Sequence, residues 1–311
     1  MDITFLLSDI VSISTPLLFA TLGEVLTERG GVINLGIEGI ILVGAVGGYL
    51  VSYRTGNPYL GILAAMLIGG GMASIHSFVT VTLKANQIVS GLAITLLGTG
   101  LSTFLGKDLI LVTASGFSKI SIPLFSQIPF IGKVIFSQNI LVYLSFITVI
   151  VLLVFLYKTR WGLNLRTVGE NPASADAMGI SVDFMRYSGV ILGGILVGLG
   201  GGYITLAYTN FWVEGITGGR GWIAIALTVF SGWSPSRALI GAYLFGSLTR
   251  FQFTLQAGGA VSGTTPYFLQ MIPYLATIIV LVFFAVKESL GWVSTPPAAL
   301  GVPYYRQKKE F

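Results

Sequence analysis

Residues 188–208, SGVILGGILVGLGGGYITLAY, decide the fold class because they form an unbroken run of 21 residues without a charge. A helix of about 20 apolar residues, rising 1.5 Å per residue, crosses the roughly 30 Å hydrocarbon core of a bilayer. Its glycines form three G-x-x-x-G pairs, a spacing that lets helix backbones approach each other closely. The stretch therefore predicts a membrane-spanning helix that packs tightly against its neighbours.

The composition of the whole chain is that of a polytopic membrane protein. Of its 311 residues, 54% are hydrophobic and only 9% are charged, against about 25% charged in an ordinary soluble domain. Mean hydropathy is +0.86. The chain has no cysteine and a single histidine, His76, which argues against an enzyme and against a metal or cofactor of its own. We read the net charge of +5 as a sign of basic cytoplasmic loops rather than of nucleic-acid binding.

Runs free of charge, bounded by Lys, Arg, Pro or Asn, predict an all-α fold with nine membrane segments. These are residues 3–23, 31–53, 59–80, 85–104, 140–157, 188–208, 221–230, 238–253 and 267–286. The segments 221–230 and 238–253 are short and are predicted to be half-helices. Asp9 and Glu38 interrupt the first two segments, so these two helices should face protein or a cavity rather than lipid.

The distribution of basic residues predicts the orientation. With nine crossings and the C-terminus inside, eleven of the 17 Lys and Arg residues fall in the cytoplasm and six fall outside, so the positive-inside rule favours N-out and C-in. No cleavable signal is visible, and the first segment is expected to remain as an anchor. The chain is then one transmembrane domain, 1–311, with an external loop at 106–138 and a cytoplasmic loop at 158–186.

The two halves of the chain echo each other weakly. In the first half, GGVINLGIEG at 30–39 precedes Asn57-Pro58 and a glycine-rich helix. In the second, GGRGWIAIA at 218–226 precedes Ser234-Pro235 and another glycine-rich helix. In the predicted topology the two copies run in opposite directions. Such an inverted repeat, with interrupted helices lining a path near the midplane, is common in transporters.

The loop 158–186 contains a short helix signal at about 171–179. Asn171 is a good N-cap, Pro172 suits the first helical position, and Gly179 can take the left-handed conformation that ends a helix. A two-turn helix is marginal alone in water, so a partner protein should stabilise it. The alternative is a capped connector without a partner.

Five stretches together resemble the permease subunits of bacterial ABC importers of the ribose, branched-chain amino acid and nucleoside class. They are ERGGVINLGIEG (28–39), LKANQIVSGLA (83–93), LRTVGENPASADAMGI (165–180), GGRGWIAIALTVFSGW (218–233) and PPAALGVPYYR (296–306). The NLGIEG and GENP wording is most similar to the smaller permease of nucleoside importers. Importers of riboflavin and of simple sugars have similar permeases.

The resemblance implies that 165–180 holds the coupling helix, which docks on a separate ATPase subunit. The residues implied in this coupling are Arg166, Glu170, Asn171, Pro172, Asp176, Met178 and Gly179. No G-x-x-x-x-G-K-[ST] phosphate loop occurs in the chain, so ATP with Mg²⁺ would be bound by the partner ATPase. The resemblance further implies a second, different and larger permease, an external substrate-binding lipoprotein, and a place in the bacterial cytoplasmic membrane.

Residues that could line a solute path are polar or aromatic groups at membrane depth, because a polar solute must keep its hydrogen bonds there. Asn34 and Glu38 lie four residues apart, on one helix face. The other candidates are Asn86, Gln87, Asn210, Phe211 and Trp212. Helix capping or pairing is the alternative for Glu38, Asn86 and Gln87, and interfacial anchoring is the alternative for residues 210–212. His76 is expected to be a hydrogen-bonded packing residue.

Two other function classes compete with an ABC permease. An ion-coupled secondary transporter would also account for an inverted repeat. However, the ionisable groups at membrane depth amount to little more than Asp9 and Glu38, which are few for a proton relay. A membrane-embedded enzyme is disfavoured by the lack of cysteine and the single histidine.

Overall fold

The protein is a helical bundle in the computed structural model, which describes residues 3–110, 112–123, 125–257, 268–269, 271–289 and 296–306. The long helices are α1 (Ile3–Arg29), α2 (Ile37–Thr55), α3 (Pro58–Ser77), α4 (Gln87–Gly106), α6 (Ile140–Lys158), α9 (Val182–Tyr203), α11 (Pro235–Ala257) and α13 (Ile272–Ser289). The shorter elements are α5 (Ile131–Ile135), α7 (Arg160–Glu170), α8 (Pro172–Ala177), α10 (Arg220–Phe230), β1 (Lys119–Ser121) and β2 (Ser137–Asn139). π-Helical turns extend α3 to Thr82 and α9 to Tyr208.

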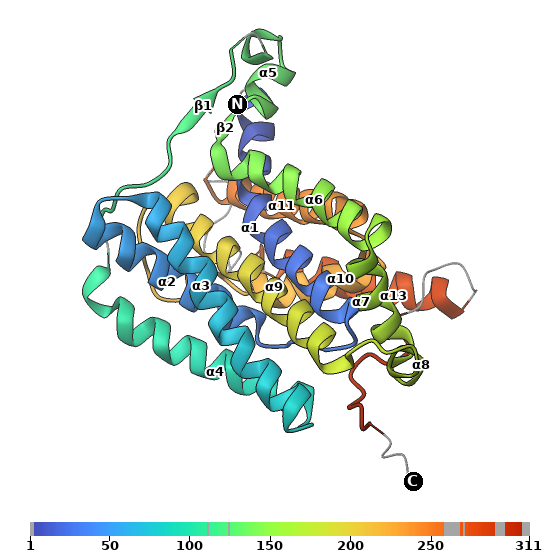
Figure 1. The fold of residues 1–311 in the computed structure, drawn as a ribbon. Helices are drawn as coiled ribbons and strands as arrows, with labels where there is room; N and C mark the ends of the chain where they lie inside the picture. The colour runs from blue at the N-terminus through green and yellow to red at the C-terminus, as the bar shows by residue number, and fades with distance from the viewer. Residues whose placement is uncertain are drawn as a thin grey trace, which may run out of the picture.

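Helices α1 and α9 run side by side through the centre of the bundle (Figure 1). Helix α9 also packs against α2 and α3, whereas α1 packs against α6, α10 and α11. The N-terminus and the β1–β2 hairpin lie at one end of the bundle, and α8 with the segment 296–306 lies at the other end (Figure 1). The hairpin, antiparallel with Ile120 opposite Gln138, belongs to the predicted external loop 106–138.

Six helices in the described part of the chain are long and apolar enough to cross a membrane, namely α1, α2, α3, α4, α6 and α9, three of them with their extensions. The chain is therefore a multi-pass membrane protein. Helix α10, with 11 residues, is short as predicted. The number of nine crossings and the N-out, C-in orientation stay predictions, and residue 267 of the last predicted segment lies outside the described residues.

Several predicted boundaries are wrong. Helix α11 has 23 residues, about 35 Å at 1.5 Å per residue, so it is not the half-helix predicted at 238–253. Helix α9 begins at Val182, so the last turn of the predicted loop 158–186 is already part of a long helix. Helix α1 continues to Arg29 instead of ending at residue 23. At the ends of α1 and α9, the charged residues that marked a boundary in the sequence, Glu24 and Arg186, are accommodated inside the bundle.

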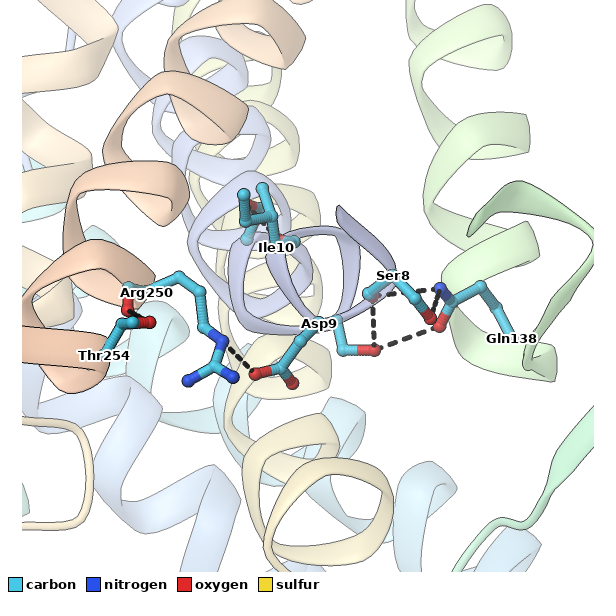
Figure 2. A network of polar contacts seen from close by, with 8 residues as sticks. Ser8, Asp9, Ile10, Gln138, Arg250 and Thr254 are labelled. Carbon is cyan, nitrogen blue, oxygen red and sulfur yellow. Dashed lines mark hydrogen bonds and ion pairs between the residues drawn. The ribbon is translucent and has the colours of Figure 1, made fainter. Parts of the chain in front are cut away.

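A polar network around the start of α1 shows how this accommodation works (Figure 2). Asp9 forms an ion pair with Arg250 of α11 at 2.7 Å, so the charge within α11 is compensated by the charge within α1. On the other side of α1, the Gln138 amide donates to the Ser8 hydroxyl, and the Ser12 hydroxyl donates to the Gln138 carbonyl, both at 3.0 Å. Paired in this way, the polar residues of α1 face protein and not lipid.

The glycines of α9 bring three helix backbones into contact with it. A Cβ added at Gly193 would lie 2.5 Å from the Gly23 carbonyl oxygen of α1, and one at Gly201 would overlap the Ile41 carbonyl oxygen of α2. One added at Gly198 would overlap the Ala65 carbonyl oxygen of α3. This close packing is the role that the G-x-x-x-G pairs predict.

Gly201→Ala should therefore destabilise the protein, because the new methyl group must push α9 away from α2, a strain that costs about 1–3 kcal/mol in packed cores. The measurement is thermal unfolding of the purified protein in detergent. Gly71→Ala on α3 is the matched control, since an added Cβ there meets nothing within 4 Å. A melting temperature for Gly201→Ala equal to that of Gly71→Ala would contradict the packing argument.

Candidate functional site

Residues 30–36, GGVINLG, connect α1 to α2 as a non-helical segment, and polar side chains of three helices satisfy backbone groups of residues 33–35. The contacts are Asn34 N to Glu24 Oε1 (3.1 Å), Ile33 N to Gln87 Oε1 (2.7 Å), His76 Nε2 to Ile33 O (3.0 Å) and Thr95 Oγ1 to Leu35 O (2.8 Å). Backbone groups inside a membrane protein need such partners because no bulk water reaches them. The segment is thus held in place from α1, α3 and α4.

His76 has the packing role expected from the sequence. It is fully buried, and its Nδ1 lies 3.0 Å from the Ser90 hydroxyl. Because the Ile33 carbonyl can only accept, Nε2 must carry the proton and Nδ1 must accept from Ser90. Both ring nitrogens are then satisfied, which leaves His76 no free group to offer a solute.

Glu38, in the first turn of α2, binds the start of α10. One carboxylate oxygen, Oε1, accepts from the Thr217 hydroxyl at 2.5 Å and from Gly219 N at 3.1 Å, and the other, Oε2, accepts from Gly221 N at 2.6 Å. The first N–H groups of a helix have no partner within the helix and carry partial positive charge. The Glu38 carboxylate therefore caps α10 and connects the start of α2 to the start of α10.

Glu38→Ala should lower stability by at least about 3 kcal/mol, because charge-assisted hydrogen bonds are worth roughly 1.5–3 kcal/mol each and two backbone donors become unpaired. Glu38→Gln keeps an acceptor oxygen and should lose less. Thermal unfolding in detergent measures both. Glu214→Ala is the control, because Glu214 is exposed and accepts one hydrogen bond, from Thr103, so this change should be within about 0.5 kcal/mol of wild type. Equal effects of the Glu38 and Glu214 changes would contradict the capping role.

The other predicted path residues also have partners within the chain. The Asn34 side chain accepts from Gly36 N at 2.9 Å, and the Asn86 side chain caps α4 by accepting from Ile88 N and Val89 N. Gln87 is buried; its Oε1 accepts from Ile33 N, while its Nε2 has no partner among the described residues. Asn86 therefore has the capping contact weighed as its alternative, whereas Gln87 holds a backbone group of another segment and Asn34 stabilises its own turn.

Residues 210–212 form the turn after α9. Asn210 adopts a positive φ of 58°, and Phe211 is exposed. Trp212 is 1% exposed, and its indole fills the space beside Gly106, where an added Cβ would overlap the ring. Trp212 is therefore a packing residue that fixes the end of α4 against this turn, while Phe211 faces outward.

Two buried carboxyl groups escaped the sequence reading. Glu24 and Glu28 of α1 are 1% and 3% exposed; Glu28 accepts from the indole N–H of Trp233, and Arg29 Nε donates to the Trp233 carbonyl at 3.0 Å. Glu28 and Arg29 thus anchor the turn between α10 and α11 to α1, whereas Glu24 holds Asn34 N. The signal was present as two carboxylates four residues apart, but the predicted end of the first span at residue 23 placed both of them outside it.

At the opposite end of the bundle from the N-terminus, α8 has the local structure predicted for the coupling helix. The Asn171 side chain accepts from Ser174 N at 3.0 Å, Pro172 occupies the first turn, and Gly179 has a φ of +81°. Met178, just beyond α8, is 81% exposed. Arg166 of α7 lies over the Tyr157 ring, with its guanidinium carbon 5.1 Å from the ring centroid.

The two carboxylates predicted to couple the ATPase bind the chain's own segment 296–306. Glu170 accepts from Ala298 N at 3.2 Å. Asp176 accepts from the Tyr304 hydroxyl at 3.1 Å and pairs with Arg306 at 3.1 Å. The same segment also donates from Ala299 N to the Gly169 carbonyl and from Gly301 N to the Gly31 carbonyl. It therefore ties α7 and α8 to the interrupted segment 30–36.

Among the described residues, no group of three or more His, Cys, Asp or Glu side chains is placed to hold a metal ion. The structure combines two helices that begin inside the bundle, α2 and α10, with the short helix α8 at one end. This arrangement suits the movement of a solute under the control of another protein.

Comparison with known proteins supports the same interpretation. The family model described as "Branched-chain amino acid transport system / permease component" matches residues 6–284. The chain is 40% identical to the putative glucose ABC transporter permease protein TsgC13 of Haloferax volcanii, over 95% of this chain and 96% of the relative. It is 39% identical to the nucleoside ABC transporter permease protein NupC of Lactococcus lactis, over 95% of each chain.

A third relative, the guanosine ABC transporter permease protein NupQ of Bacillus subtilis, is 35% identical over 99% of this chain and all of the relative. No solved structure matches the chain.

Proposed function

The chain belongs to the family of permease components of branched-chain amino acid transport systems, and from this premise we propose that it is the smaller permease subunit of an importer for nucleosides. It is a permease subunit of an ABC importer and not an enzyme. Membership of this family implies an ATPase partner and a binding protein. The observation that carries the proposal is the similarity, over nearly the full length, to permeases named for nucleosides and for guanosine.

A second candidate solute is glucose, which the similarity to the permease TsgC13 supports. A simple sugar and a nucleoside both carry hydroxyl groups, and the relatives of this chain include permeases named for each kind of solute. Riboflavin, the remaining alternative from the sequence, is not the named solute of any of the three relatives compared.

We further propose that α8 and Met178 form the contact with the ATPase. The exposure of Met178 and the polar surroundings of α8 support this assignment, because a hydrophobic side chain held out at the tip of a short capped helix suits insertion into a partner's groove. Glu170, Asp176 and Arg306 then position the coupling helix rather than contact the ATPase.

The assembly proposed around this chain has three other kinds of subunit. An ATPase binds ATP with Mg²⁺, a second and different permease completes the path, and a lipoprotein outside the cell supplies the solute. We place the assembly in the bacterial cytoplasmic membrane with the α8 end inside. No role is proposed for nucleic acid.

The test is uptake by the complete assembly reconstituted in lipid vesicles. With ATP and binding protein present, labelled guanosine and uridine should accumulate, and unlabelled nucleosides should compete with them whereas glucose should not. Accumulation of glucose but not of nucleosides would contradict the nucleoside assignment. Uptake by the isolated chain, driven by an ion gradient without ATP, would instead support a secondary transporter.

Met178→Glu should reduce solute-stimulated ATP hydrolysis at least about tenfold, because a carboxylate placed in an apolar groove loses its hydration without gaining a partner. Its melting temperature should be that of wild type, since the side chain is 81% exposed. Met178→Leu is the matched control and should keep stimulation. Full stimulation in Met178→Glu would remove this residue from the ATPase contact.

A further inference from the structure

A cavity of about 360 Å³, lined by both polar and apolar side chains, lies between α10, α11 and α13, a size within the roughly 300–1,000 Å³ typical of small-molecule sites. The residues that line it come from the start of α10, the last turns of α11 and the start of α13. They are Gly218, Arg220, Ile223, Thr249, Gln252, Phe253, Gln256, Pro273 and Tyr274. The lining residues of α11 and α13 did not attract attention in the sequence, whereas Gly218, Arg220 and Ile223 belong to the stretch 218–226.

Four of the lining residues share one face of α11. Thr249, Gln252, Phe253 and Gln256 follow the spacing i, i+3, i+4, i+7, which places them one above another along the helix. Arg250 and Thr254 lie on a different face of the same helix (Figure 2), where Arg250 reaches Asp9 of α1. Helix α11 is therefore polar on two sides, and only the side toward α1 is explained by packing within the chain.

Two carboxamides on the cavity wall, those of Gln252 and Gln256, have polar atoms without partners among the residues that the structure describes, whereas the Thr249 and Tyr274 hydroxyls donate to the Phe245 and Gly218 carbonyl oxygens. Gln252 is 6% exposed, yet none of its side-chain atoms makes a hydrogen bond there. The Gln256 amide nitrogen is buried and also without a partner. Buried polar groups are hydrogen-bonded in the large majority of cases, so two unpaired carboxamides on one cavity wall need an explanation.

Arg220 places a guanidinium on the same wall, and only some of its N–H groups have acceptors. Its Nη1 donates to the Ile216 and Thr217 carbonyl oxygens at 3.1 and 2.8 Å, and within the described residues Nε and Nη2 make no hydrogen bond. The cavity wall contains no carboxylate. Glu38, on the far side of the first turn of α10, interacts electrostatically with Arg220, so the cavity does not need an anion to balance its charge.

We infer that this cavity is a solute-contact site of the permease and that it takes a neutral nucleoside; the inference rests on the proposed function. A carboxamide both donates and accepts, and it pairs in a bidentate manner with the edge of a nucleobase. The rings of Phe253 and Tyr274 supply aromatic faces on which a base stacks. The guanidinium of Arg220 donates to ribose or base oxygens. A hexose would use the donors but not the aromatic faces.

The position of the cavity fits an encounter with incoming solute. Its α11 residues lie close in the chain to Arg250, which pairs with Asp9 near the start of α1, so the cavity belongs to the half of the bundle opposite α8. In the predicted orientation this is the outer half. A solute released by the binding protein would then meet these carboxamides before it passes the interrupted helices.

The test uses Gln252→Met and Gln256→Met, singly and together, in the complete reconstituted importer. Methionine keeps the length and approximate volume of glutamine but removes the polar atoms. Each single variant should lower guanosine uptake per ATP hydrolysed about tenfold, since one lost hydrogen bond of about 1.4 kcal/mol corresponds to that factor. Thr254→Val is the matched control, because its hydroxyl donates to the Arg250 carbonyl on another face of α11, and it should transport as wild type.

Stability separates a contact role from a structural one. Because the two carboxamides are unpaired, their replacement by methionine should leave the melting temperature unchanged or raise it. Uptake by the double variant within twofold of wild type, or a loss of uptake matched by a lower melting temperature, would overturn the inference. Failure of the wild-type assembly to transport any nucleoside would instead defeat the proposed function, so the two failures are distinguishable.

Discussion

Two helices of this protein, α2 and α10, begin inside the bundle rather than at its surface, and the backbone groups at or just before their starts, which need partners from other segments, are the constraint on which the rest depends. Glu38 satisfies the start of α10 from the first turn of α2. Glu24, His76, Gln87 and Thr95 satisfy the segment that precedes α2. Without water in the hydrocarbon region, each of these groups would otherwise remain unpaired at a cost of several kcal/mol.

A continuous series of contacts leads from these interrupted helices to α8. Gly31 accepts a backbone hydrogen bond from Gly301, and the segment containing Gly301 is held by Glu170 and Asp176. A displacement of α8 by a partner would therefore act on the non-helical segment 30–36 and, through α2, on Glu38. The glycine contacts of α9 hold α1, α2 and α3 close to it.

Local features of the chain were predicted well because they depend on neighbours in sequence. Asn171, Pro172 and Gly179 specify the cap, first turn and end of α8, and the charge-free runs specify the centres of the long helices. Helix ends were predicted less well. The first predicted segment ends at residue 23, just before the charge of Glu24, but Glu24 accepts from Asn34 N and Glu28 accepts from the Trp233 indole, so α1 continues to Arg29.

The sequence by itself determined that this is a helical membrane protein, where its apolar helices lie, and which family it resembles, since these follow from composition, local spacing and shared motifs. Only the tertiary structure decided what the polar residues at membrane depth do. Glu38 and Gln87 serve backbone groups of other segments, whereas Gln252 and Gln256 face a cavity without partners. The sequence alone does not show whether a Glu or Gln side chain is paired, because its partners lie far away along the chain.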